Sequence, residues 1–265
     1  MLYMFEQTQH EILNKILKGR HIKSVYQPIV SLTDGEIFGF EALSRISDDS
    51  LTMNIEQMFR TADKINKSWE LEILCRDKAL ESAFYIDCNK KLFLNVNPNI
   101  IHDTEFTSGF TKSKLNEYGI SPCNIIFEIT ERVAIIDNNV FIDSIKHYRN
   151  QNYGIAIDDV GAGYSGLNTL SAVKPNIIKL DMSLIRCIDE DEIKQLICKA
   201  MVDFCKSANI LLIAEGIESK NELETLIKLN VDFGQGYFLG IPQKSFADIT
   251  PEKIEMINMY NKKLR

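Results

Sequence analysis

Seven short apolar runs in this sequence each carry one polar residue close to the point where the run ends. These seven residues are Glu41, Asn95, Glu128, Asp158, Lys179, Glu215 and Gln235. Asp159, which directly follows Asp158, is the eighth polar residue of the set. Five of the eight are carboxylates, and burying a carboxylate without a partner costs several kcal/mol. One such residue alone could be a helix cap or a solvated loop acid. Seven in successive runs are better explained by one shared site.

The residue types in this set predict a metal site. Carboxylates that share a pocket repel one another and force some of their number to take up protons, unless cations compensate them. Hard oxygen ligands without cysteine or histidine favour Mg²⁺ or Mn²⁺ over zinc. Five carboxylates and Asn95 exceed what one Mg²⁺ usually takes from protein, so the set predicts two ions that share a carboxylate. Paired ions suit in-line displacement at phosphorus by an activated water, which Lys179 is expected to orient.

The runs themselves are predicted to be buried strands, because they are rich in Ile, Leu, Val and Phe and bounded by turn-forming residues. They cover residues 24–32, 37–43, 92–98, 125–130, 154–160, 176–181, 209–216 and 232–240. Amphipathic helical patterns alternate with them over residues 54–84, 138–150, 190–207 and 218–229. The expected N-caps of the last three helices are Asn138 or Asn139, Asp189 and Ser219.

Alternating strands and helices in a chain of 265 residues predict an α/β fold, a closed TIM-like (β/α)8 barrel. Only residues 33–36 separate the first two strands, which is a hairpin loop, so the first strand is expected to run antiparallel to the second. The polar residues then gather at the carboxyl-terminal face of the barrel. An N-terminal helix over 1–20 is expected to precede a barrel domain over 21–265 and to pack on the bottom of the barrel.

The composition excludes several classes of protein. A net charge of −7 argues against a partner that is a nucleic-acid polymer and against attraction to an anionic membrane. No stretch approaches the roughly 20 apolar residues of a membrane span, and no signal peptide is recognisable. The six cysteines form no C-x-x-C pair, so they are expected to be core residues of a cytoplasmic protein. The four histidines are scattered, which disfavours a histidine-based metal site.

The polar residues also fall in short motifs that follow one another along the chain. These are YQPI (26–29), EALSR (41–45), NVNP (95–98), EITE (128–131), DDVGAGYS (158–165), KLD (179–181), AEGIE (214–218) and QGY (235–237). In this order they resemble the signature motifs of EAL domains, the phosphodiesterases of cyclic di-GMP. The resemblance runs from about residue 20 to residue 245, and it implies a TIM-like barrel with an antiparallel first strand.

The resemblance implies a role for each site residue. It places one metal ion on Glu41, Asn95, Glu128 and Asp158, and a second on Asp158, Asp159 and Glu215. It assigns catalysis to Lys179, Glu215 and Asp159. It assigns substrate binding to Gln27, Leu43, Arg45, Asn95, Asp158, Lys179, Gln235 and Gly236, with Arg45 on a phosphate. Glu131 would anchor the loop 160–166, Gly161 and Gly163 would permit its turn, and Glu218 would support the site from behind.

The activity that the resemblance implies is hydrolysis of cyclic di-GMP to linear pGpG with two Mg²⁺ or Mn²⁺ ions per site, and it leaves inhibition by Ca²⁺ open. It also implies a homodimer formed through the helices after strands five and six, including residues 160–173. Val160 and Ala162 replace the family's usual Phe and Thr, which is expected to loosen this loop and lower the rate. The effect of Asn97 in place of serine is left open.

Two alternatives remain at this point. One is a weak or inactive receptor that binds cyclic di-GMP and acts through a protein partner. The other is a two-metal barrel for another phosphodiester or a sugar phosphate. No G-G-[DE]-E-F cyclase motif is present and little chain precedes residue 20, so a stand-alone catalytic domain is expected.

Overall fold

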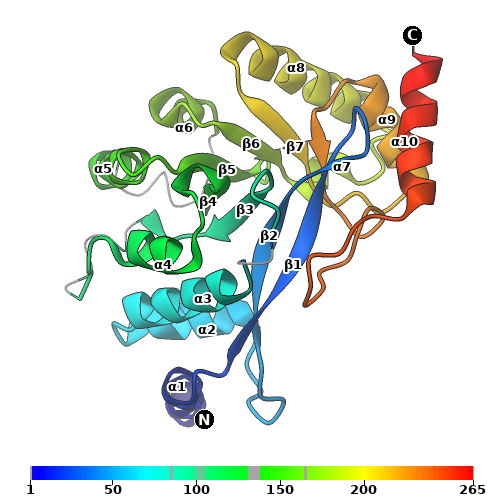
Figure 1. Cartoon of the computed structure of the whole chain (residues 1–265). Coiled ribbons are helices and arrows are strands. Elements are labelled where there is room, and N and C mark those ends of the chain that lie inside the picture. The colour runs from blue at the N-terminus through cyan, green and yellow to red at the C-terminus, as the bar shows by residue number, and fades with distance from the viewer. Residues whose placement is uncertain are drawn as a thin grey trace.

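A computed structural model describes residues 2–83, 86–98, 100, 103, 105–130, 138–163 and 166–264. Eight strands close into a barrel in sequence order (Figure 1). They are β1 (Ile22–Ser31), β2 (Ile37–Ile46), β3 (Lys91–Asn95), β4 (Ile125–Thr130), β5 (Gly154–Val160), β6 (Ile177–Leu180), β7 (Leu211–Ala214) and β8 (Phe233–Gly234). β1 pairs antiparallel with β2 and with β8, and the other neighbours pair in parallel. The predicted barrel with an antiparallel first strand is confirmed.

Helices surround the barrel on the outside (Figure 1). They are α1 (Leu2–Gly19), α2 (Ile55–Lys64), α3 (Ser68–Ala83), α4 (Phe110–Tyr118), α5 (Asn138–Arg149), α6 (Gly166–Val173), α7 (Met182–Ile185), α8 (Glu192–Ala208), α9 (Lys220–Lys228) and α10 (Pro251–Lys263). A short 3₁₀ turn, Pro122–Asn124, leads into β4. Within the described residues, no helix is both long and apolar enough to cross a membrane.

The last predicted strand, 232–240, is much shorter in the structure. Only Phe233 and Gly234 pair as β8, and the chain then turns, with the N–H groups of Leu239 and Gly240 donating to the carbonyl of Gly236. Gly236 permits this turn because it has no Cβ, and a Cβ at this position would overlap the backbone of Ile217. The close contact between two backbones therefore ends the strand early.

Two helix predictions need correction. The pattern over 54–84 is two helices, because Asn66 adopts a left-handed conformation (φ 54°) between α2 and α3. The N-cap of α8 is Asp191, which accepts from the N–H groups of the first turn, and not Asp189. Ser219 caps α9 as predicted, in a capping box with Glu222. Asn138 is the first residue of α5 itself, so its cap position lies outside the described residues.

The N-terminal helix α1 lies beside α2 and α3 rather than on the bottom of the barrel. Leu13 and Ile16 of α1 share an apolar cluster with Met58 and Leu71. α1 leads into the start of β1, which pairs with the end of β2 because the two strands are antiparallel. The helix is therefore held at the end of the barrel where β2 stops, which is the end that carries the polar residues.

The cysteine prediction holds only in part. Cys198 and Cys205 of α8 are buried in the main core, and Cys75 is half-buried. The other three cysteines are exposed at the surface: Cys88, Cys123 and Cys187.

Candidate functional site

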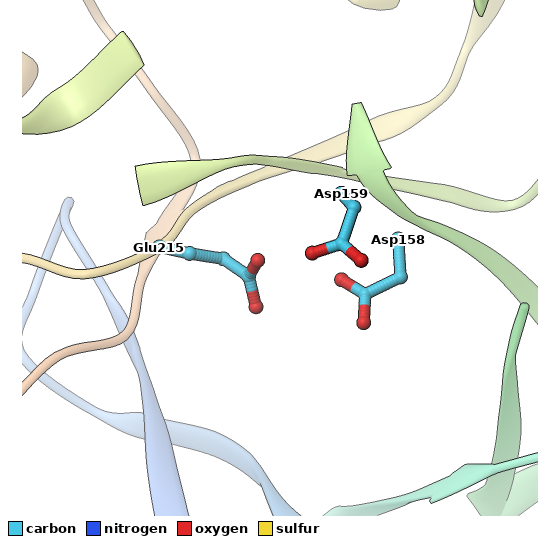
Figure 2. Close-up of side chains that lie close together, drawn as sticks. All are labelled: Asp158, Asp159 and Glu215. Carbon is cyan, nitrogen blue, oxygen red and sulfur yellow. The ribbon is translucent and has the colours of Figure 1, made fainter. Parts of the chain in front are cut away.

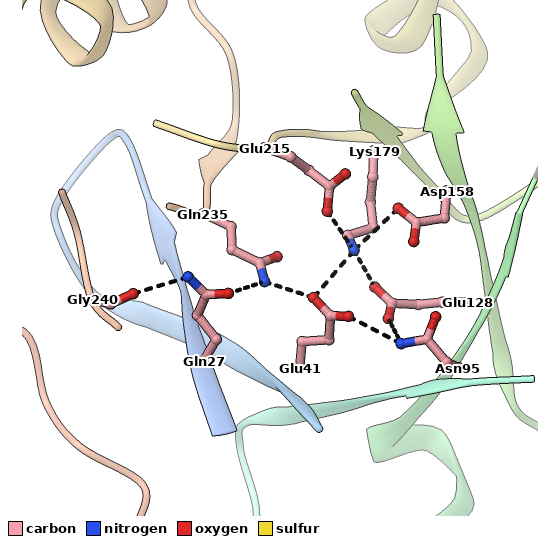
Figure 3. A network of polar contacts seen from close by, with 9 residues as sticks. All are labelled: Gln27, Glu41, Asn95, Glu128, Asp158, Lys179, Glu215, Gln235 and Gly240. Carbon is pink, nitrogen blue, oxygen red and sulfur yellow. Dashed lines mark hydrogen bonds and ion pairs between the residues drawn. The ribbon is translucent and has the colours of Figure 1, made fainter. Parts of the chain in front are cut away.

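The predicted polar residues converge at one end of the barrel lumen (Figure 3). Strand register explains this arrangement, because residues at the same level of neighbouring strands face the same interior. Gln27 pairs with Glu41 across β1 and β2, and Asn95 pairs with Glu128 across β3 and β4. The side chains that are largely buried there are Gln27, Glu41, Glu128, Asp158, Lys179 and Gln235.

Lys179 stands at the centre of the carboxylates, and its side chain is 0% exposed. Its Nζ lies 2.6 Å from Glu128 Oε1 and 2.6 Å from Glu215 Oε1. It also lies 3.2 Å from Asp158 Oδ1 and 3.5 Å from Glu41 Oε2. Four carboxylates from four different strands or strand ends thus share one ammonium group.

Three amide side chains complete this network. Asn95 Nδ2 donates to Glu41 Oε1 at 3.0 Å and to Glu128 Oε2 at 3.3 Å. Gln235 Nε2 donates to Glu41 Oε2 at 2.6 Å and to Gln27 Oε1 at 3.1 Å. Gln27 Nε2 in turn donates to the carbonyl of Gly240 at 3.0 Å, which fixes the orientation of both glutamines.

The pKa shifts in the site reflect burial first and the crowding of carboxylates second. Burial raises the pKa of Glu128 well above its ordinary value, and the Glu41 carboxylate adds to this. Burial likewise raises the pKa of Glu215, and it raises the pKa of Asp159 to about 6 together with the neighbouring carboxylates. Glu41 is also desolvated, but Lys179 and the amide donors hold its pKa below the ordinary value. Burial would lower the pKa of Lys179, yet the surrounding carboxylates raise it well above the ordinary value.

Three of these carboxylates lie close enough to share a metal ion. Asp158, Asp159 and Glu215 each offer an oxygen, and these oxygens all lie within 4.8 Å of one another (Figure 2). Neighbouring residues of a regular strand point to opposite faces. Asp159 joins Asp158 because its backbone is left-handed (φ 59°) and the β5–β6 register shifts between Ile157 and Val160. Such irregularities are common beside active sites, where they redirect a side chain.

The donor set fits divalent cations of the Mg²⁺ or Mn²⁺ type, because every candidate ligand offers an oxygen. In the described part of the site, five carboxylates face one ammonium, which leaves a formal charge of −4. Two divalent ions would balance that charge. Burial, followed by the neighbouring carboxylates, raises the pKa values of Glu128, Glu215 and Asp159, and bound cations would favour the ionised forms of these groups.

Residues 10–242 match the family model of the EAL domain. The chain belongs to the EAL domain family. This EAL domain is 28% identical over 245 residues to the probable cyclic di-GMP phosphodiesterase PdeB of Escherichia coli K12, covering 91% of this chain and 46% of PdeB. The chain spans 29% of another curated relative, the oxygen sensor protein DosP of the same organism. It therefore covers less than half the length of these two relatives.

Two solved structures resemble this EAL domain closely. A standalone EAL protein of Vibrio cholerae O395, in a form bound to cyclic di-GMP, has a TM-score of 0.76 and 33% identity; the match covers 87% of this chain and 96% of that one. BlrP1 of Klebsiella pneumoniae, in a complex with calcium and cyclic di-GMP, has a TM-score of 0.78 and 26% identity; the match covers 87% and 58%.

Three residues that were predicted to bind substrate lie outside the central network. Leu43 and Arg45 follow Glu41 on β2, and both are half-buried. The Arg45 guanidinium donates to the carbonyl of Ser44 at 2.8 Å. Gly236 lies against the backbone of Ile217, so this EAL domain needs glycine there for close packing. Their contacts with substrate stay predictions.

The predicted supporting residues are described only in part. Glu131 lies outside the described residues, as do residues 164 and 165 of the loop 160–166. Gly161 and Gly163 have positive φ (102° and 108°), as their predicted turn requires. A Cβ on Gly161 would overlap Leu184 of α7, so this glycine also admits α7 beside the loop. Glu218 forms an ion pair with Arg186 at the start of the segment that joins α7 to α8.

Two carboxylates near the site, Asp181 and Glu72, were not predicted from the sequence to have a role. Asp181 follows β6, caps α7, and contributes to the raised pKa of Asp159. It lies in the KLD motif, so its position directly after a strand was the available signal. Glu72 of α3 is buried beside Arg76, and the signal for it was a Glu–Arg pair four residues apart within an apolar pattern.

Proposed function

We propose that this EAL domain is a metal-dependent phosphodiesterase that hydrolyses cyclic di-GMP to linear pGpG. The observation that carries the proposal is the set of carboxylates around Lys179, whose unbalanced charge calls for divalent cations. The names of the related proteins and the cyclic di-GMP in the related structures support the choice of substrate.

Two groups of ligands would hold the ions. Asp158, Asp159 and Glu215 would hold one ion, and Glu41, Asn95, Glu128 and Asp158 would hold the other. Such ions, when bound, lower the pKa of water and stabilise negative charge on a phosphoryl oxygen. Mg²⁺ and Mn²⁺ are the ions that this donor set favours.

The chain's own groups orient the reactants around these ions. Lys179 stays protonated at neutral pH, because the carboxylates raise its pKa, so it is a fixed donor for a water or a phosphate oxygen. Gln235 is held by Glu41 and Gln27, which prevents its amide from turning away from the site. Arg45 offers a planar fork of donors suited to a phosphate.

The test is to incubate the purified protein with cyclic di-GMP and either Mg²⁺ or Mn²⁺, and to measure pGpG by chromatography. We expect pGpG with at least one of the two metals and none above background with Glu41→Ala. Glu36→Ala is the matched control, since Glu36 lies just ahead of the same strand with its side chain 74% exposed. Binding of cyclic di-GMP without any pGpG would favour the receptor alternative and overturn the proposal.

We also propose that the chain forms a homodimer through the helices after β5 and β6, and the described side chains of α8 support this interface. The observation is an apolar stripe on that helix: Ile193 is 65% exposed, Leu196 59%, Ile197 41% and Phe204 41%. Their spacing places all four on one helix face, and exposed apolar patches of this kind mark interaction surfaces. Light scattering at micromolar concentration should give a dimer for the wild type and a monomer for Leu196→Glu. Lys199→Glu on the same helix is the control, and an unaltered dimer in Leu196→Glu would contradict this interface.

A further inference from the structure

A buried ion pair lies behind the barrel wall, outside the network around Lys179. Arg76 Nη2 donates to Glu72 Oε2 at 2.8 Å, one turn apart on α3, and both side chains are 5% exposed. Buried ion pairs of this kind add little net stability, because desolvation of the charges offsets their attraction. What the pair supplies is a carboxylate oxygen fixed at one point.

The second oxygen of Glu72 holds the segment that follows β3. The backbone N–H of Asn97 donates to Glu72 Oε1 at 2.7 Å. Asn97 stands two residues after Asn95, whose side chain donates to Glu41 and Glu128. Between them, the N–H of Val96 donates to the carbonyl of Glu128 at 3.0 Å. The Glu72 carboxylate is thus connected to the site through the backbone of residues 95–97 and the side chain of Asn95.

Arg76 is itself fixed from two further sides. Its Nη1 donates to Thr111 Oγ1 of α4 at 3.0 Å, within the buried region. Its guanidinium lies 5.2 Å from the centre of the Phe127 ring, and Phe127 directly precedes Glu128 on β4. Arg76 therefore sets the orientation of Glu72 against the two strands that carry Asn95 and Glu128.

We propose that Glu72, oriented by Arg76, is a positioning residue that sets the place of Asn95 through the backbone N–H of Asn97. This inference rests on the proposed function, since the geometry of Asn95 matters most where Asn95 is a metal ligand. Outer partners of metal ligands commonly change metal affinity or activity by 10- to 100-fold when they are removed. Glu72 acts one step further out, so the lower end of that range, about tenfold, is expected.

The test uses two double variants that differ only in the acceptor. A single change of Glu72 would leave Arg76 buried without its partner and risk unfolding. In Glu72→Met/Arg76→Met both charges are gone, and so is the Glu72 oxygen that accepts from the Asn97 N–H. In Glu72→Gln/Arg76→Met both charges are gone, but the amide oxygen can still accept from the Asn97 N–H. Asp77→Asn is the control on the same helix, because the ion pairs of Asp77 among the described residues are with Arg20 and Lys114.

Two readouts are compared at a temperature where every variant is folded: the Mn²⁺ affinity by calorimetry, and hydrogen exchange at the Asn97 amide by NMR. We expect Glu72→Met/Arg76→Met to bind Mn²⁺ about tenfold more weakly and to lose protection at Asn97. Glu72→Gln/Arg76→Met and Asp77→Asn should stay close to wild type. Equal Mn²⁺ affinity in the two double variants would overturn the inference, because it would show that the acceptor for the Asn97 N–H has no effect on the metal site.

If the proposed function is wrong, the wild-type protein itself gives a different result. Wild-type protein that binds no Mn²⁺ would refute the metal site itself. In that case the exchange rate at the Asn97 amide still decides whether Glu72 holds this segment. Equal rates in the two double variants would overturn the inference, and a faster rate only in Glu72→Met/Arg76→Met would support it.

Discussion

The variant Lys179→Met tests whether the crowded carboxylates depend on Lys179 for the stability of the fold. The side chain of Lys179 lies 2.6 Å from two carboxylates and within 3.5 Å of two more, with none of its surface exposed. Removing one partner of a buried ion pair typically costs about 3–5 kcal/mol. We therefore expect the metal-free variant to lose at least about 3 kcal/mol of unfolding free energy at pH 7.5.

The loss should shrink in acid. Burial raises the pKa of Glu128 and of Glu215, and it raises that of Asp159 to about 6. For a carboxyl whose pKa is higher in the folded state, the ionised form weakens folding, and protonation relieves this as the pH falls through that pKa. At pH 5.5, below the pKa of about 6 for Asp159, this carboxylate takes up a proton and the crowding is partly relieved, so wild type and variant should differ less than at pH 7.5.

The assay is urea unfolding with EDTA at both pH values. Lys199→Met is the matched control, because Lys199 forms an exposed pair with Asp203 on α8 and should change stability by only about 0–1 kcal/mol. With metal and cyclic di-GMP present, Lys179→Met should also lower turnover by about 10²–10³-fold. If Lys179→Met were as stable as Lys199→Met at pH 7.5, the reasoning about surplus charge would be refuted.

Three further predictions concern the metal, the glutamines and the turn after β8. Mn²⁺ affinity should fall as the pH drops through about 6, because protons compete for Asp159; calorimetry showing equal affinity at pH 7.5 and 5.5 would speak against it. Gln27→Ala should lower kcat/KM by roughly fivefold, the equivalent of about 1 kcal/mol, since Gln235 loses the partner that orients it; unchanged steady-state kinetics would exclude this role. Gly236→Ala should cost about 1–3 kcal/mol, because its Cβ meets the backbone of Ile217; an unchanged urea midpoint would contradict that packing.

Much of the barrel is readable from the sequence because its strands are short apolar runs that end in polar residues. The four-residue gap before Ile37 was enough to predict the antiparallel first strand. The end of β8 was not predictable, because it depends on contact between Gly236 and Ile217. These residues lie in different segments, so no local sequence pattern connects them. The helix break at Asn66 was missed for a related reason, since the apolar spacing continues across it.

The candidate site was predictable in its residue types but not in its geometry. Strand periodicity places Asp158 in the lumen, yet it would turn Asp159 away from it. Only the left-handed backbone at Asp159 brings the two together, and periodicity carries no signal for that. Likewise, the position of Lys179 among four carboxylates follows from the closure of the barrel, which joins β2, β4, β5, β6 and the end of β7 around one point.

The most direct measurement is a Mn²⁺ titration of the metal-free wild-type protein in the presence of cyclic di-GMP, with the nucleotides separated by chromatography. We expect two Mn²⁺ ions per chain, with linear pGpG formed in proportion to the fully loaded protein. Cyclic di-GMP that binds yet is recovered intact at saturating Mn²⁺ would contradict the proposal that this barrel is a phosphodiesterase.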